Sequence, residues 1–305
     1  MGKIAFVFPG QGAQYAGMGK ELAAYSPAAA DIFRHADLLR PETSRQCFSG
    51  PEEELAETKN TQPCVLTAEL AAAAALSAAG IRADMLAGHS LGELAAMIFS
   101  GALTYEEGFR LVCLRGELMQ RDAEKSRSGM AAVLRLDADT VGRLCSQYAH
   151  VYPANDNCPG QIVVSGLEEE LAAFCGDVKA AGGRALPLRV RGGFHSPLMA
   201  QAAAEFEKAA ASLSFRKPAV PLYSNCTGQV YGDNFAELLG KQICTPVRWQ
   251  DVVGSMIRDG ADTFIEIGPG KTLCGLIGKI DASVRTLHVE DCESLEEAVR
   301  EAAGC

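Results

Sequence analysis

Residues 85–93, with the sequence MLAGHSLGE, decide the fold because they place an abrupt bend between a short apolar strand and a helix. Residues 88–92 form the pattern G-x-S-x-G, and small residues on both sides of a serine are needed where the backbone bends tightly. Such a bend exposes the Ser90 hydroxyl at the N-terminus of the helix, where the backbone N–H of Leu91 can face a developing oxyanion. The pattern predicts Ser90 as a nucleophile and Leu91 as an oxyanion donor.

Strands and helices alternate on both sides of this bend. Residues 3–8 form an apolar strand that ends in a glycine-rich turn, and residues 62–79 form an alanine-rich helix closed by Gly80. Thr104 and Glu107 form a capping box that begins a further helix towards Arg121. Two later strands and a closing helix complete this part of the chain: residues 220–224, 263–267 and 294–303. The alternation predicts an α/β fold with a mainly parallel sheet.

The segment between these parts has the order strand–helix–strand–strand–helix–strand, which is the ferredoxin-like pattern. Its expected elements are residues 131–136, 138–147, 151–154, 161–165, 168–181 and 184–190. We therefore predict an α/β-hydrolase-like large domain with a parallel sheet, residues 1–126 and 193–305, and an inserted ferredoxin-like small domain, residues 127–192. A cleft between two such domains is a common place for a substrate site.

A serine hydroxyl needs a base near neutral pH, and the chain has five histidines. His195 follows two glycines, which permit close approach of the backbone, and it precedes a helix start with Ser196 as its N-cap. We expect His195 at the junction of the two domains and predict it as the base. His89 adjoins the serine, but its side chain is expected to diverge from Ser90 and pack against the turn.

A rival set of residues, Ser90, Asp262 and His288, has the serine–acid–histidine order of α/β-hydrolase triads. Asp262, however, comes before its expected strand, whereas a triad acid belongs at the carboxyl end of a sheet strand. The order alone is therefore weak support for this triad.

Arg115 is the other charged candidate, because an apolar stripe of Leu111, Leu114 and Leu118 places it on the inward face of its helix. A guanidinium on that face needs an anionic partner. The sequence leaves open whether this partner is a substrate or a structural counter-ion.

The composition excludes several classes of protein. The chain has 305 residues and a formal net charge of −10, which disfavours nucleic acid as a partner. No apolar stretch is long enough to predict a membrane span, and the amino terminus does not resemble a secretory signal, so we expect a cytoplasmic protein. Four basic residues could meet an anionic partner or be solvated surface charges: Arg184, Arg189, Arg191 and Lys271.

Eleven scattered cysteines without a CxxC pair disfavour a metal site and predict reduced, mostly buried thiols. Residues 265–272 superficially match a phosphate-binding loop, but Ile265 stands where the pattern requires glycine. We expect neither a metal nor a cofactor.

Several motifs in the right order resemble the malonyl-CoA:acyl carrier protein transacylases, the stand-alone relatives of the acyltransferase domains of fatty acid and polyketide synthases. The resemblance spans nearly the whole chain. It is carried by FPGQG at residues 8–12, GHSLGE at 88–93, RG at 115–116, MQ at 119–120, NDNCPG at 155–160, FHSPLM at 194–199, Gln242, PVRW at 246–249 and EIGPG at 266–270.

The resemblance implies a Ser90–His195 dyad without an acid, in which the backbone carbonyl of Gln242 accepts the hydrogen bond from the histidine. It also implies that the backbone amides of Gln11 and Leu91 form the oxyanion hole.

The substrate contacts are likewise implied by the resemblance. Arg115 would grip the free malonyl carboxylate, and Phe194, Gln242 and Asn157 would line the substrate site. Phe194 before His195 looks like the malonyl-selecting form of this motif.

The function expected from the motifs is transfer of a malonyl group from malonyl-CoA, which is a substrate, to the phosphopantetheine thiol of an acyl carrier protein by a ping-pong mechanism. A monomer is expected. Three alternatives stay open: an acyl-CoA thioesterase or hydrolase on the same scaffold, a trans-acting polyketide acyltransferase, and a docking module for a carrier protein.

Overall fold

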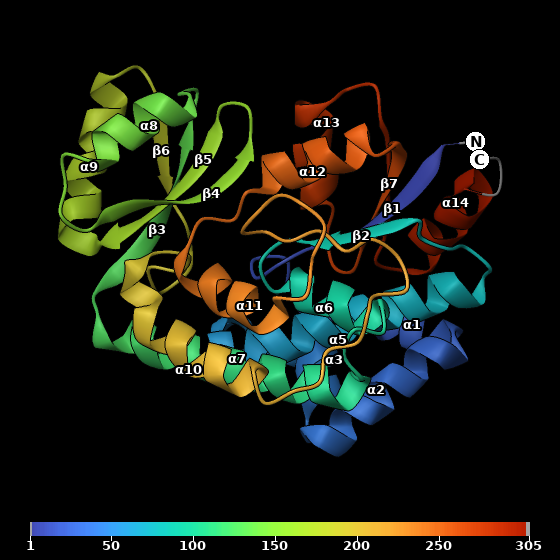
Figure 1. Ribbon diagram of the computed structural model, residues 1–305. Helices are drawn as coiled ribbons and strands as arrows, with labels where there is room; N and C mark the ends of the chain where they lie inside the picture. Colours follow the sequence, from blue (N-terminus) through green and yellow to red (C-terminus); the bar gives the residue numbers. More distant parts are fainter. Residues whose placement is uncertain (1, 303–305) are drawn as a thin grey trace.

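A four-stranded parallel sheet organises the larger part of the molecule. The computed structural model describes residues 2–302, and its sheet order is β2 (Met85–Gly88), β1 (Lys3–Phe8), β7 (Ala261–Ile267) and β8 (Arg285–Val289). β1 lies between β2 and β7 (Figure 1), and after Lys3 it is an uninterrupted apolar run, as is usual for a parallel strand covered on both faces. The predicted α/β fold with a parallel sheet is confirmed.

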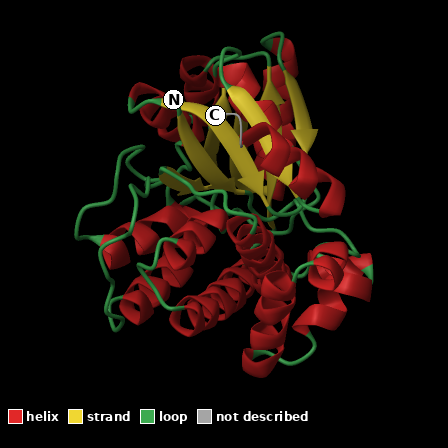
Figure 2. Ribbon diagram, turned by 90° about the vertical axis from the view of Figure 1, so that its right-hand side faces the viewer, coloured by secondary structure: helices red, strands yellow, loops and turns green. Residues whose placement is uncertain are grey.

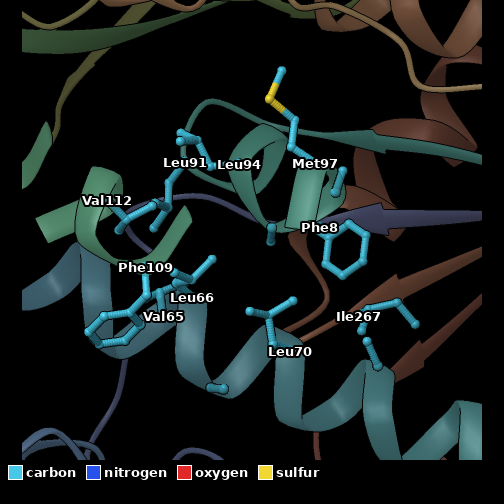
Figure 3. Close-up of a cluster of buried hydrophobic side chains, with 14 of the residues drawn as sticks. Phe8, Val65, Leu66, Leu70, Leu91, Leu94, Met97, Phe109, Val112 and Ile267 are labelled. Atoms are coloured by element: carbon cyan, nitrogen blue, oxygen red, sulfur yellow. The ribbon is translucent and has the colours of Figure 1, made fainter. Parts of the chain in front are cut away.

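Side chains alternate across the sheet and enter two separate cores. Phe6 and Phe8 of β1 belong to the larger core, while Ala5 and Val7 belong to the core on the opposite face. This alternation follows from the two-residue period of a strand. In Figure 3, Leu70 of α5 (Thr58–Ala78) lies near Phe8 in the larger core.

Helices cover both faces of this sheet, and Figure 2 shows a large group of them below the strands. The larger core is covered by α5 together with α6 (Gly92–Phe99) and α7 (Tyr105–Lys125). The other face packs against α12 (Trp249–Arg258) and α13 (Thr272–Ile280). The remaining helices of this part are α1 (Lys20–Tyr25), α2 (Pro27–Leu39), α3 (Thr43–Ser49), α4 (Glu52–Ala56), the 3-10 turn Pro197–Met199, α10 (Ala200–Ala210), α11 (Phe235–Cys244) and α14 (Cys292–Ala302).

A second sheet is antiparallel and lies apart from the first (Figure 1). Its strands, in spatial order, are β4 (Val151–Cys158), β5 (Gln161–Leu167), β3 (Ser128–Leu134) and β6 (Arg184–Pro187). Two helices, α8 (Ala138–Cys145) and α9 (Glu168–Ala180), pack on it and enclose a small core of its own. The chain order is therefore strand–helix–strand–strand–helix–strand, as the sequence predicts.

Backbone hydrogen bonds tie the second sheet to the chain that leads into α12. The N–H of Asp156 in β4 donates to the carbonyl of Val247 over 2.9 Å, and the N–H of Val247 donates to the carbonyl of Ala154 over 2.9 Å. Because Val247 lies two residues before α12, these bonds tie β4 to the larger part of the molecule.

The predicted strand at residues 220–224 is wrong. Leu222 forms only an isolated bridge to Leu86, supported by bonds from the N–H of Leu86 to Pro221 and from the N–H of Tyr223 to Leu86. Pro221 has no N–H to donate, which disfavours a regular ladder. The fourth strand of the parallel sheet is β8 instead, whose first four residues are partly exposed and give no long apolar pattern.

Several predicted boundaries also shift. Helix α5 begins at Thr58 rather than at residue 62, with Pro63 accommodated near its start. β6 ends at Pro187, before residue 190, although the N–H of Leu188 still donates to the carbonyl of Met130 in β3 over 2.9 Å. The helix predicted at residues 294–303 begins at Cys292, and residue 303 lies outside the described part of the chain.

Candidate active site

Ser90 lies at a tight bend between β2 and α6, in the left-handed backbone region with φ of 55°. A Cβ atom on Gly88 would lie 1.9 Å from the carbonyl carbon of Gly92, and one on Gly92 would lie 2.1 Å from the carbonyl oxygen of Phe8. Only glycine fits such close backbone contacts. Non-glycine residues in this region are strained, and strain of this kind is often found at active sites.

Two side chains from distant parts of the sequence hold this bend. The N–H of Ser90 donates to Oδ1 of Asn225 over 2.7 Å, and Nε2 of Gln242 donates to the carbonyl of Ser90 over 2.8 Å. Asn225 also donates from Nδ2 to the carbonyl of Gly88 over 2.7 Å. Sequence reasoning missed Asn225, because an asparagine 135 positions away in a loop carries no local signal of this contact.

The structure brings His195 to the serine hydroxyl. Nε2 of His195 lies 2.8 Å from Oγ of Ser90, and Nδ1 lies 2.7 Å from the carbonyl oxygen of Gln242. A carbonyl can only accept, so Nδ1 carries the proton and Nε2 is free to accept one from the serine. His195 has φ of 57° and is 4% exposed.

Burial, and next the positive charge of Arg115, lower the pKa of His195 to about 3. The imidazole is therefore neutral around pH 7, which is the form that a general base requires.

Arg115 is buried on the inward face of α7, as its stripe predicts. Nη2 donates to Oγ of Ser90 over 3.2 Å and to Oε1 of Gln242 over 2.7 Å, while Nη1 donates to Oε1 of Gln62 over 3.0 Å. Within the described residues, Nε has no hydrogen-bond partner. Burial lowers the pKa of Arg115 to about 10, with Glu93 opposing the shift, so the guanidinium stays charged near neutral pH. A cation beside the hydroxyl of Ser90 suits an anionic substrate.

The loop that carries Gln11 runs alongside the serine bend. β1 and β2 are parallel neighbours with Phe8 opposite Gly88, and the N–H of His89 donates to the carbonyl of Phe8 over 2.8 Å. The side chain of Gln11 donates to Thr58 over 3.1 Å, which anchors the loop on α5. The hydrogen bonds of residues 2–302 show no acceptor for the backbone N–H of Gln11 or of Leu91. Both groups remain predicted oxyanion donors.

Asn157 does not contact Ser90 or Arg115 through any hydrogen bond of the described residues. Its Oδ1 lies 2.9 Å from Nε2 of His89, whose ring also packs edge-on against Trp249 with centroids 5.5 Å apart. The side chain of His89 therefore meets β4 and α12 rather than the hydroxyl of Ser90, as the expected divergence from Ser90 requires. Burial lowers the pKa of His89.

Phe194 is buried in the larger core, 5% exposed, directly before His195. Its carbonyl accepts a hydrogen bond from the hydroxyl of Ser165 in β5, so it ties the approach to His195 to the second sheet. Its part in substrate selection remains a prediction.

The rival triad is not assembled. His288 lies on β8 and Ser90 follows β2, and these strands are at opposite edges of the sheet, roughly 14 Å apart at ordinary strand spacing. Nε2 of His288 is 3.8 Å from Oε1 of Glu290 instead, and Asp262 lies near the start of β7. The hydroxyl of Ser90 has His195 as its imidazole partner.

Four further features concern the surface charges, metal ligands, membrane-spanning helices and thiols. The candidate basic residues Arg184, Arg189, Arg191 and Lys271 are exposed, and Arg189 forms only a long 3.9 Å ion pair with Glu52. Within residues 2–302 no group of three potential ligands could hold a metal, and no helix is long and apolar enough to cross a membrane. The ten cysteines described there are unpaired and buried or partly buried.

Comparison with known proteins agrees with this geometry. The family described as "Acyl transferase domain" matches residues 5–302. The malonyl CoA-acyl carrier protein transacylase of Bacillus subtilis (strain 168) is 40% identical, and the alignment covers 98% of this chain and 97% of that protein. The corresponding transacylase of Staphylococcus aureus (strain MSSA476) is 36% identical over 97% of this chain and 98% of its own length.

Solved structures give the same picture. The malonyl CoA-acyl carrier protein transacylase of Clostridium perfringens superposes with a TM-score of 0.95 at 38% identity, covering 99% of this chain and 98% of that chain. A malonyl-transacylase solved in complex with its type II PKS acyl-carrier protein also gives a TM-score of 0.95, at 34% identity, covering 98% of this chain and 99% of its own.

Proposed function

The chain belongs to the acyl transferase domain family, and from this premise we propose that it moves a malonyl group from malonyl-CoA to the phosphopantetheine thiol of an acyl carrier protein. The main support for the proposal is that one hydroxyl has two hydrogen-bond partners. Oγ of Ser90 lies 2.8 Å from Nε2 of His195 and 3.2 Å from Nη2 of Arg115. A base and a cation on the same oxygen suit acyl transfer from a substrate that has a carboxylate near its reacting carbonyl.

In the first half-reaction, Nε2 of His195 takes the proton of Ser90 while the serine oxygen attacks the thioester carbonyl. The N–H groups of Gln11 and Leu91 bind the oxyanion of the tetrahedral intermediate. The carbon–sulfur bond then breaks, His195 returns the proton to the departing sulfur, and coenzyme A leaves a malonyl ester on Ser90.

In the second half-reaction, His195 takes the proton of the carrier's thiol, and the sulfur attacks the malonyl ester. The ester bond breaks and the proton goes back to Ser90. The carbonyl of Gln242 keeps Nδ1 of His195 protonated and the ring in place throughout, which is the part that an acid takes in a triad.

Arg115 places the free carboxylate of the malonyl group. Its guanidinium offers parallel N–H donors that match a carboxylate. Phe194, Gln242 and Asn157 complete the proposed substrate site. All the groups named come from a single chain, so we propose that a monomer is sufficient for the reaction.

We also propose the finer description of the fold. The larger part, residues 1–126 and 193–305, is α/β-hydrolase-like, because a nucleophile lies on a sharp strand–helix bend at the carboxyl end of a parallel strand. The part at residues 127–192 is ferredoxin-like. Its support is the chain order β3-α8-β4-β5-α9-β6 together with the strand order β4-β5-β3-β6.

Incubation with malonyl-CoA followed by intact-mass measurement tests the proposal. The wild-type chain is expected to gain a malonyl adduct, the Ser90→Ala variant is expected to gain none, and added carrier protein is expected to remove the adduct. An undiminished adduct on Ser90→Ala contradicts the mechanism. Loss of the adduct to water at the same rate with and without carrier favours a thioesterase, and a chain that binds carrier without forming any adduct is a docking module.

The carrier can be tested in the same assay. Fatty acid synthesis is the context we propose, since the curated relatives above are malonyl CoA-acyl carrier protein transacylases. The solved complex with a type II PKS acyl-carrier protein makes a polyketide carrier the second candidate. Comparing transfer rates to the two kinds of carrier decides between them.

A further inference from the structure

Glu93 is a fully buried carboxylate beside the nucleophile, and the mechanism above does not use it. Its Oε2 accepts hydrogen bonds from Nε2 of Gln242 over 2.7 Å and from the backbone N–H of Asn225 over 3.3 Å, and its Oε1 accepts one from the hydroxyl of Tyr231. All three partners donate, which is the arrangement that an ionised carboxylate satisfies. A buried carboxylate with this set of donors fixes the groups around it.

Two of these partners are the residues that hold the serine bend. Oδ1 of Asn225 accepts from the N–H of Ser90, and Nε2 of Gln242 donates to the carbonyl of Ser90. Glu93 therefore binds both side chains that hold the backbone N–H and carbonyl of Ser90, whose φ is 55°. Such a conformation persists only where its surroundings enforce it.

Glu93 also decides which way the amide of Gln242 faces. Nε2 points to the carboxylate, so Oε1 points to Nη2 of Arg115 at 2.7 Å. The reversed amide would set an oxygen against the carboxylate and an NH₂ group against the guanidinium. Both reversed contacts would be repulsive, because a carboxylate only accepts and a guanidinium only donates.

Burial raises the pKa of Glu93 to about 7, and its three hydrogen-bond donors and Arg115 oppose this shift. Where Glu93 is ionised, its negative charge offsets part of the positive charge of Arg115 without a direct ion pair between the two side chains. The hydrogen bonds place Gln242 between the two side chains, and the negative charge opposes the lowering of the arginine pKa that burial causes. The guanidinium thus stays charged and available to a substrate.

We infer that Glu93 is a positioning residue for malonyl recognition: through Gln242 and Asn225 it orients Arg115 and holds the nucleophile bend, without touching the substrate. The inference rests on the proposed malonyl transfer. It assigns the selectivity for a carboxylate to a chain of contacts from Glu93 to Gln242 to Arg115 rather than to the arginine alone.

The test measures acylation of Ser90 by malonyl-CoA and by acetyl-CoA in Glu93→Gln, using intact mass at short times. With Glu93→Gln, an amide NH₂ faces the donors around it and Gln242 loses its fixed orientation. We expect malonyl acylation to fall about 10- to 100-fold, and the preference for malonyl over acetyl to fall with it.

Glu69→Gln is the matched control, because Glu69 is equally buried on a helix and has no hydrogen bond to any site residue among residues 2–302. The acylation rates of this variant should stay within about twofold of wild type.

A folded Glu93→Gln protein with wild-type selectivity overturns the inference, as do equal losses for the two acyl groups, since a general loss of structure lowers both alike. If Glu93→Gln does not fold, the Tyr231→Phe variant is measured in the same assay.

This change removes the hydroxyl that donates to Glu93 and keeps the ring stacked on Phe235, with ring centroids 5.0 Å apart. Selectivity for malonyl should then fall about three- to tenfold, and unchanged selectivity overturns the inference. A wild-type chain that forms no malonyl adduct contradicts the proposed function instead.

Discussion

At the scale of single residues, the site depends on a neutral imidazole held by a backbone carbonyl. Replacing His195 by Ala removes the proton acceptor of Ser90 and leaves the bend itself intact. We expect the rate of malonyl-enzyme formation to fall on the order of a thousandfold or more, measured by rapid mixing and intact mass. His288→Ala is the control and should leave the rate unchanged, because His288 is on the far edge of the sheet. If His288→Ala lowers the rate more than His195→Ala does, the triad of Ser90, Asp262 and His288 would be supported instead.

Arg115 gives a second prediction at this scale. Arg115→Ala removes the cation beside Ser90, so malonyl acylation should fall about 10- to 100-fold, while acetyl acylation is spared or improved. Arg110→Ala is the control on the same helix, since Arg110 is exposed and pairs only with Glu106. Equal losses for malonyl and acetyl groups would make Arg115 a structural residue.

At the scale of elements, the strand–helix junction around Ser90 has no room for a side chain at its glycines. Gly88→Ala would press a Cβ against the backbone of Gly92, and we expect a loss of about 1–3 kcal/mol in the free energy of unfolding, together with loss of acylation. Gly142→Ala is the control. It lies in α8 with no atom within 4 Å of the added Cβ, so it should stabilise by roughly 0.5–1 kcal/mol. Urea unfolding of both variants measures the difference, and a Gly88→Ala protein as stable as wild type would refute this account.

At the scale of the whole molecule, buried carboxyls make stability depend on pH. Glu69 is buried, and neither of its oxygens has a hydrogen-bond partner among residues 2–302. Burial, followed by repulsion from Glu266, raises its pKa well above the usual value. Burial likewise raises the pKa of Glu266 to about 7. Above the ordinary carboxyl pKa the unfolded chain releases these protons, while the folded chain keeps them. The contribution of these groups to stability is therefore fully present below the ordinary carboxyl pKa and is lost as pH rises through the folded pKa.

Thermal unfolding should therefore show a midpoint that decreases from about pH 6.5 to pH 8. Below that range the lowered pKa of His195 acts in the opposite direction, because the unfolded chain binds a proton there that the folded chain does not. Glu69→Gln removes one of the titrating groups, so it should raise the midpoint more at pH 8 than at pH 5. An equal change at both pH values would show that Glu69 does not keep its proton in the folded chain.

Much of the fold could be predicted because its signals are local. The apolar run of β1, the capping box of Thr104 with Glu107 and the Ser196 cap all appear in the structure where the sequence places them. The edge strand β8 could not be predicted, because its half-exposed residues lack an apolar pattern. Residues 220–224 gave a false strand because a short apolar run does not reveal that Pro221 interrupts the ladder.

The sequence by itself determined the bend at Ser90, the candidate base at His195 and the inward-facing Arg115, since each depends on neighbours within a few positions. The resemblance of the motifs implied the Ser90–His195 pair, but only the tertiary structure decided that Arg115 shares the same oxygen. Only the tertiary structure, too, decided that Glu93, Asn225 and the side chain of Gln242 hold these groups there. Glu93 did leave a signal, as a charge in the otherwise apolar helix α6, but its partners are more than 130 positions away. Contacts between residues so distant in the sequence follow from the packing of the whole chain, and no local pattern of side chains encodes them.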